Sequence, residues 1–170
     1  MYKRQGLYTT NSEFRNNYIN TLAKLIDSAK GDIVLDLANN SGGDVVPMII
    51  GASSLIPPGK ILNSIDKNGN KFPIYLESNK LFGGITNYLE DSSKQLKTQK
   101  YPFKKNKKVS VIISDRTASA AEVLTLVLKN NPNVTVLGTP SAGYTSWNET
   151  AVLPNKDNPS NFWYLIYTAC

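Results

Sequence analysis

Short segments that are almost continuously apolar constrain the fold of this chain more than any other feature. They are residues 32–37, 109–113 and 134–138. Segments of this kind are typical of strands buried on both faces of a parallel sheet. The first two are each followed by a corner of small residues and then by a segment with helical periodicity. This repeated order of strand, corner, helix and strand predicts an α/β fold, with helices packed on a mainly parallel sheet.

Helices are expected between these strands. Thr10 and Glu13 have the spacing of a capping box, and the apolar residues that follow recur at helical intervals, so a first helix is expected to end near Gly31. A second helix is expected over residues 45–55, with a proline tolerated in its first turn. The segment 120–129 predicts a third helix.

The rest of the chain gives weaker signals. Two alternating segments, 61–65 and 72–76, flank a turn at residues 68–69 and predict a β-hairpin. Residues 78–107 are polar with weak periodicity, and they are expected to form an insertion with some helix. Two further strand-like segments are expected after Trp147.

Composition excludes several classes of function. A length of 170 residues predicts one domain, and no apolar stretch is long enough for a transmembrane helix or a secretory signal. Because the sequence has no histidine and a single cysteine, Cys170, only carboxylates remain as side-chain metal ligands. The spacing of the glycines fits neither a phosphate loop nor a dinucleotide fingerprint. No metal and no cofactor are therefore predicted.

The chain is basic, with a formal net charge of +6. Much of the excess lies in one segment, with six lysines between residues 97 and 108. Such a cluster can bind nucleic acid. It is more often a solvated connection, and no aromatic-rich strand that could stack bases accompanies it. Nucleic acid is therefore not predicted as a partner.

The two corners carry the candidate chemistry. Residues 117–122 read Thr-Ala-Ser-Ala-Ala-Glu, and residues 37–44 read Leu-Ala-Asn-Asn-Ser-Gly-Gly-Asp. Ser119 is expected at the first turn of its helix, where unpaired N–H groups and the positive end of the helix dipole lie. If its hydroxyl attacked a carbonyl, the Ala120 N–H and an N–H of the glycine pair could stabilise the oxyanion. The corners together predict a serine hydrolase.

Each corner also has a plainer interpretation. Ser119 could be an ordinary helix cap, which is the commoner use of a serine before an alanine-rich helix. The glycine pair could be an ordinary turn between a strand and a helix. Glu122 lies one helical turn beyond Ser119, so it could orient a polar neighbour or only favour the helix start. Finding both corners, each after a buried strand, favours the catalytic interpretation.

These motifs resemble the tail-specific, or carboxy-terminal processing, serine peptidases. Residues 35–43 are similar to the Leu-Asp-Leu-Arg-x-Asn-x-Gly-Gly stretch of that family, and residues 109–143 are similar to its nucleophile region. The likeness covers about residues 31–153. It implies a crotonase-like fold, a superhelix of ββα units. It also implies Ser119 as the nucleophile, and an oxyanion hole formed by Ala120 with Gly42 and Gly43.

Within the family, the chain most resembles the nisin-resistance-protein branch, on residues 44–48 and 141–145. The resemblance implies a peptide substrate cut near its carboxyl end, such as a lanthionine bacteriocin, at the outer face of the cell envelope. Asn40, Asp44 and Tyr144 are the candidate substrate-binding residues. The oligomeric state is not implied.

The chain departs from the family pattern in two respects. Ala38 replaces the usual arginine. Neither base of the family is matched: Tyr144 stands where the processing branch has a lysine, and the histidine of the nisin-resistance branch belongs to an N-terminal region that this sequence lacks. Lys156 lies in a polar turn and is a poor substitute. The chain is therefore expected to be one partial catalytic domain of a longer protein, over residues 1–170.

A serine hydroxyl without a base is a weak nucleophile at neutral pH. The chain alone is thus expected to hydrolyse peptides very slowly or not at all. Two other functions remain open. One is a peptide-binding or immunity module on the same scaffold. The other is a crotonase-type acyl-thioester enzyme, which the serine at the corner disfavours.

Overall fold

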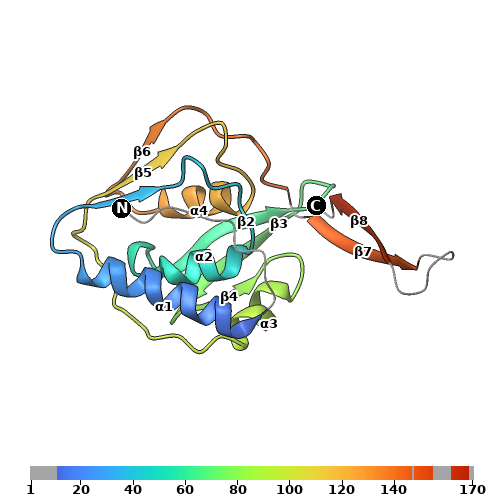
Figure 1. The fold of residues 1–170 in the computed structure, drawn as a ribbon, viewed down its shortest axis with the longest axis horizontal. Helices are drawn as coiled ribbons and strands as arrows, with labels where there is room; N and C mark the ends of the chain where they lie inside the picture. The colour runs from blue at the N-terminus through green and yellow to red at the C-terminus, as the bar shows by residue number, and fades with distance from the viewer. Residues whose placement is uncertain (1–10, 147, 155–161, 169–170) are drawn as a thin grey trace.

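A computed structural model describes residues 11–146, 148–154 and 162–168. Its centre is a parallel sheet in the order β1-β5-β6, formed by Ile33–Asp36, Val109–Ile113 and Val134–Gly138 (Figure 1). Leu35 pairs with Val111, and Val111 pairs with Val136. All three predicted strands are present, and their parallel pairing is confirmed. Their expected burial on both faces is wrong, because Val34 of β1 and Leu137 of β6 are 52% and 50% exposed.

Helices α1 (Ser12–Ser28), α2 (Val45–Gly51) and α4 (Ala120–Leu128) lie on one side of this sheet (Figure 1). Helix α2 packs against both α1 and α4, and all but its first residue are buried. The apolar core surrounds these helices: it extends from the parallel sheet to residues 61, 76, 81 and 89 on the other side. Every helix that the sequence predicts is present.

Two helix boundaries differ from those expected. The cap of α1 is Asn11, whose side chain accepts hydrogen bonds from the N–H groups of Glu13 and Phe14; Thr10 lies outside the described residues. The expected helix over residues 45–55 ends at Gly51, and a separate 3₁₀ turn, η1, covers Ser53–Leu55. Ala52 between them leaves helical geometry, with φ −95° and ψ 6°.

A second sheet is antiparallel, in the order β2-β3-β4, formed by Gly59–Ile65, Lys71–Glu77 and Lys80–Gly83. Its first two strands are the predicted hairpin. The polar insertion supplies β4 and also α3, which covers Tyr88–Lys94 and packs against β4. The insertion is therefore ordered against the body of the molecule, and α3 lies near the N-terminal end of α1 (Figure 1).

The two strands expected after Trp147 are present as an antiparallel hairpin, β7 (Asn148–Pro154) and β8 (Phe162–Thr168). The hairpin extends away from the rest of the molecule (Figure 1). Trp147, Lys156 and Cys170 lie outside the described residues. None of the described helices is long and apolar enough to span a membrane.

Candidate active site

Ser119 occupies a sharp turn between β5 and α4. It is the N-cap of α4, with φ 53° and ψ −123°, and the Ala121 N–H closes the turn on the Ala118 carbonyl at 3.1 Å. An ordinary N-cap residue is extended, as Asn11 and Asp44 are in this chain. A non-glycine residue at positive φ costs free energy and is frequently associated with function, as at the strained turn that carries the nucleophile of α/β-hydrolases. Ser119 thus differs from an ordinary cap in backbone conformation, although it forms a capping box with Glu122 at the start of α4.

Hydrogen bonds join the two corners directly. The Ala118 N–H donates to the Asn40 carbonyl at 3.1 Å, and the Thr117 hydroxyl donates to the Leu37 carbonyl at 2.8 Å. The Ser114 hydroxyl donates to the carbonyl of Ala38. Because the two corners lie at the carboxyl ends of the adjacent strands β1 and β5, their residues meet at one edge of the sheet.

The diglycine bend, Gly42-Gly43, lies against the serine. A methyl carbon added to Gly42 would lie 2.7 Å from Ser119 Cβ and 3.0 Å from the Ala120 nitrogen, closer than real side chains approach. Both glycines have positive φ, 102° and 124°. Glycine is therefore required at position 42 by contact as well as by backbone conformation.

The N–H groups at this contact are not equivalent. The Gly42 N–H donates to Asn40 Oδ1 at 2.9 Å and is already occupied. Among the described residues, no acceptor contacts the N–H of Gly43 or that of Ala120. The two N–H groups available to a ligand are thus one from the diglycine bend and one from the start of α4.

Glu122 accepts four hydrogen bonds. Its carboxylate binds the Ser119 N–H at 2.8 Å, the Ser141 hydroxyl at 2.6 Å, and the N–H groups of Gly143 and Tyr144 at 2.7 and 2.8 Å. The side chain is only 4% exposed. Glu122 therefore ties the segment after β6 to the serine corner, and the Ala142 N–H adds a fifth contact by donating to the Thr117 carbonyl.

These contacts decide the charge state of Glu122. Burial raises the pKa of its carboxyl, but the hydrogen bonds from Ser141, Gly143, Ser119 and Tyr144 outweigh burial and hold the pKa below its ordinary value of 4.5. Hydrogen bonds to a carboxylate favour its ionised form. Glu122 is thus a buried anion at neutral pH.

The three candidate substrate-binding residues have different surroundings. Asn40 is buried, and both its side-chain and main-chain oxygens are used within the two corners. Asp44 caps α2 through the Val46 N–H at 3.1 Å and forms an ion pair with Arg15. The Tyr144 side chain is 67% exposed beside the Glu122 contact, so of the three it is the one open to a ligand.

Sequence reasoning did not place Arg15 in this region, and it gave Thr117 and Ser141 no individual role although both lie in quoted motifs. Thr117 is a small polar residue, and the carbonyl that its hydroxyl bonds lies 80 residues away. Ser141 is part of a matched motif, but its partner Glu122 could be identified only from the coordinates. In the part of the chain that the structure describes, no cluster of residues suited to hold a metal ion is present.

Comparison with known proteins gives one family. The model of peptidase family S41 matches residues 7–162. The nisin-resistance protein of Lactococcus lactis subsp. lactis is 33% identical over 148 residues, which are 86% of this chain and 44% of that protein.

Solved structures with a similar fold include relatives of the same kind. A lipoprotein from Streptococcus agalactiae has a TM-score of 0.67 and 29% identity, over 88% of this chain and 48% of the other. The photosystem II D1 C-terminal processing protease has a TM-score of 0.55 and 19% identity, over 97% of this chain and 35% of the other. The latter likeness concerns the fold alone. The chain spans less than half the length of these relatives.

Proposed function

The chain belongs to peptidase family S41, and on that premise we propose that it is a serine peptidase domain with Ser119 as its nucleophile. The Ser119 oxygen forms a bond to the carbonyl carbon of a peptide as its proton passes to a base. The base gives that proton to the amine as the C–N bond breaks, and a water molecule, which loses a proton to the base, then releases the acyl group as a carboxylic acid. The negative charge on the carbonyl oxygen is held by the N–H groups of Ala120 and Gly43.

One observation supports this proposal above the others: the contact of Gly42 with Ser119 and Ala120. It shows that the diglycine bend and the start of α4, which carry the two available N–H groups, lie against the serine; that both groups face its hydroxyl is part of the proposal. Each donor of an oxyanion hole is typically worth about 10²–10³ in rate. The α4 dipole adds to the stabilisation because its positive end faces the same place.

The chain as it stands lacks a matched base. Its sequence has no histidine, and the polar contacts of the described corner residues include no lysine side chain. In the subtilisin series, loss of the serine or the base costs about 10⁶ in turnover. We therefore expect this polypeptide alone to hydrolyse peptides very slowly or not at all, and Ser119→Ala to change that rate little.

The substrate class follows from the relatives and remains part of the proposal. We propose peptides cut near the carboxyl end, such as lanthionine bacteriocins, with Tyr144 on the substrate side; the support is the name of the nisin-resistance protein among the relatives. The full-length protein would act at the outer face of the cell envelope. The arrangement of β1, β5 and α4 is consistent with a crotonase-like ββα core.

A fluorophosphonate probe tests the nucleophile. Peptide mass mapping after prolonged labelling of the 170-residue chain should find the adduct on Ser119, and Ser119→Ala should abolish it. Thr139→Ala, a change in the exposed segment after β6, is the control and should label as the unaltered chain does. Labelling elsewhere with equal efficiency would contradict the proposal.

A second candidate is a module that holds an extended peptide without cutting it. The absence of histidine from the sequence favours it. Peptide binding with no labelling of Ser119, even at high probe concentration, would select this alternative.

A further inference from the structure

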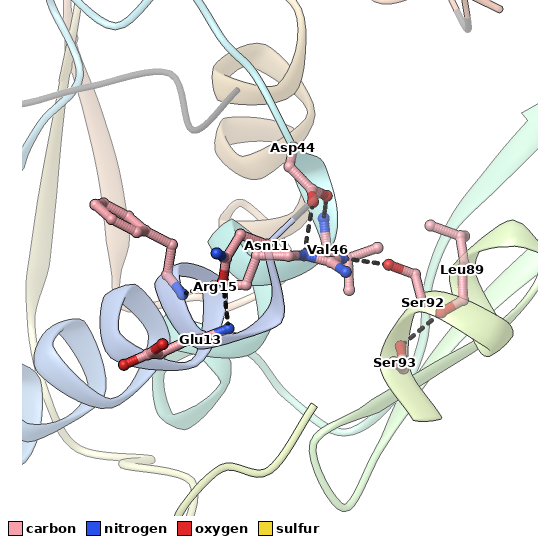
Figure 2. Close-up of polar contacts among 9 residues, drawn as sticks. Asn11, Glu13, Arg15, Asp44, Val46, Leu89, Ser92 and Ser93 are labelled. Atoms are coloured by element: carbon pink, nitrogen blue, oxygen red, sulfur yellow. Dashed lines mark hydrogen bonds and ion pairs between the residues drawn. The ribbon is translucent and has the colours of Figure 1, made fainter. Parts of the chain in front are cut away.

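A charged cluster around Arg15 and Asp44 adjoins the diglycine bend, because Asp44 follows Gly43 directly (Figure 2). Arg15 of α1 is 5% exposed, and its Nε lies 2.9 Å from Asp44 Oδ2, an ion pair outside hydrogen-bond geometry. The Arg15 guanidinium also donates through Nη2 to the hydroxyl of Ser92 in α3. Three separate segments therefore meet at one side chain.

Asp44 is the residue directly after Gly43. One of its carboxylate oxygens accepts from the Val46 N–H, and the other faces Arg15, as Figure 2 shows. On the opposite side of the bend, Asn40 holds the Gly42 N–H and accepts from the Ala118 N–H. Glycine residues are conformationally permissive. The bend thus depends on anchors at both ends, and the anchor after Gly43 is the Asp44–Arg15 pair.

The insertion completes this anchor. The Tyr88 hydroxyl is hydrogen-bonded to both Asp44 and Ser92. Helix α3 is fixed in turn, because the Ser93 hydroxyl donates to the Leu89 carbonyl at 2.6 Å and accepts from the Leu81 N–H at 3.1 Å. A chain of contacts therefore runs from β4 through α3 and Arg15 to the residue beside Gly43.

Stability alone is a weak reason for such a cluster. Burial of an ion pair costs desolvation that the attraction between the charges often fails to exceed. In this cluster, burial raises the pKa of the Asp44 carboxyl above its ordinary value of 3.8, although Arg15 and the hydrogen bonds of Val46 and Tyr88 act in the opposite direction. Such a pair is better explained by a requirement for one fixed geometry.

We infer that Arg15 is a positioning residue that holds the Gly43 N–H toward Ser119, through its ion pair with Asp44 and its hydrogen bond to Ser92. This rests on the proposed function, in which the Gly43 N–H binds the oxyanion. Arg15 itself is buried against Asp44 and is not expected to touch the substrate.

Amide hydrogen exchange of the full chain tests the positioning. Arg15→Lys keeps the charge but loses the fork that reaches Ser92. Ser92→Ala and Tyr88→Phe each remove one hydroxyl and keep the ion pair. In Arg15→Lys we expect the Gly42 N–H, which is bonded to Asn40 Oδ1, and the Val46 N–H, which is bonded to Asp44 Oδ1, to exchange about tenfold faster, the size expected for one hydrogen bond to a charged group. Ser92→Ala and Tyr88→Phe should show smaller increases at the same two sites.

Lys94→Met is the matched control. Lys94 lies on α3, the helix that carries Ser92, and forms only exposed ion pairs there, with Glu90 and Asp91. The variant should leave exchange at Gly42 and Val46 unchanged. Equal acceleration of amides throughout α1 and α2 in Arg15→Lys would overturn the inference, since it would show general destabilisation. Unchanged exchange at both Gly42 and Val46 in Arg15→Lys and Ser92→Ala would overturn it as well.

A peptidyl boronic acid separates this inference from the proposed function. Its boron can form a tetrahedral adduct with Ser119, which ¹¹B NMR detects, and one boron oxygen then stands in for the oxyanion. No adduct with the unaltered chain would defeat the proposed function, whatever the exchange data show. An adduct that Arg15→Lys weakens about tenfold, with the Lys94→Met control unaffected, supports both. An adduct that Arg15→Lys leaves unchanged defeats the positioning role alone.

Discussion

The two corners of the site are held in opposite ways. The serine corner is fixed mainly by neutral donors around one carboxylate, that of Glu122. The diglycine corner is fixed after Gly43 by an ion pair between Asp44 and Arg15. The pKa of Glu122 is lowered and that of Asp44 is raised, although both carboxyls are buried.

The difference shows what each corner requires. Ser119 sits in a strained turn that is short and local, so a carboxylate three residues away can hold it. The diglycine bend has little stiffness of its own, and its anchor comes from helices distant in the sequence. A rigid nucleophile and a flexible donor loop therefore need local and long-range support, respectively.

The largest effect should follow from Gly42→Ala. The added carbon meets Ser119 Cβ and two backbone atoms, and position 42 has a positive φ. We expect a loss of about 3 kcal/mol or more in the free energy of unfolding, because a buried clash adds to backbone strain. Urea denaturation measures the loss.

Gly69→Ala is the control for Gly42→Ala. Gly69 also has a positive φ, 83°, but open space surrounds its Cα. Strain alone should cost about 1–2 kcal/mol there. Equal losses of unfolding free energy in the two variants would show that Gly42 does not contact the serine corner.

Glu122→Gln should have the next largest effect. The amide keeps one acceptor oxygen but turns an NH₂ group toward donors that need an acceptor. We expect a loss of about 2 kcal/mol, since hydrogen bonds to charged groups are worth about 1.5–3 kcal/mol each and some are retained. Glu90→Gln, which removes an exposed ion pair, should cost less than about 1 kcal/mol. A Glu122→Gln loss no larger than that of Glu90→Gln would contradict the anchoring role.

The pH dependence of stability should distinguish the corners. The lowered pKa of Glu122 gives stability that is present above pH 4.5 and is lost as pH falls through the folded-state pKa. The raised pKa of Asp44 has the opposite sign: its contribution is present below pH 3.8 and is lost as pH rises through the folded-state pKa. In urea denaturation at a series of pH values, Glu122→Gln should lose less stability on acidification below pH 4.5 than the unaltered chain. A steeper acid loss in that variant would refute the assignment.

Tyr144→Ala should have the smallest effect on stability. The side chain is exposed, and Glu122 holds the backbone N–H, which alanine retains. We expect a change within about 0.5 kcal/mol. Weaker binding of a peptide boronic acid, measured by titration, would support Tyr144 as a substrate-side residue; unchanged binding would remove it from the site.

The sequence was sufficient where the signals are local. The apolar strands, the glycine pair and the small residues around Ser119 predicted the parallel sheet and both corners, because each pattern lies within one short segment. It was not sufficient for Arg15, whose hydrogen-bond partner in α3 lies 77 residues away in a segment with weak periodicity. Nor could it show that Asn40 occupies the Gly42 N–H and leaves that of Gly43 available. The assignment of Gly43 and Ala120 to an oxyanion hole stays a prediction, and Gly42 can take part only by its close contact with Ser119, because its N–H is occupied.

A crystal structure of the chain with a peptidyl boronic acid tests the central claim most directly. We predict a covalent bond from boron to Ser119 Oγ, with one boron oxygen roughly 2.7–3.1 Å from the nitrogens of both Gly43 and Ala120. A boronate bound elsewhere, or one on Ser119 whose oxygens face away from the diglycine bend, would contradict it.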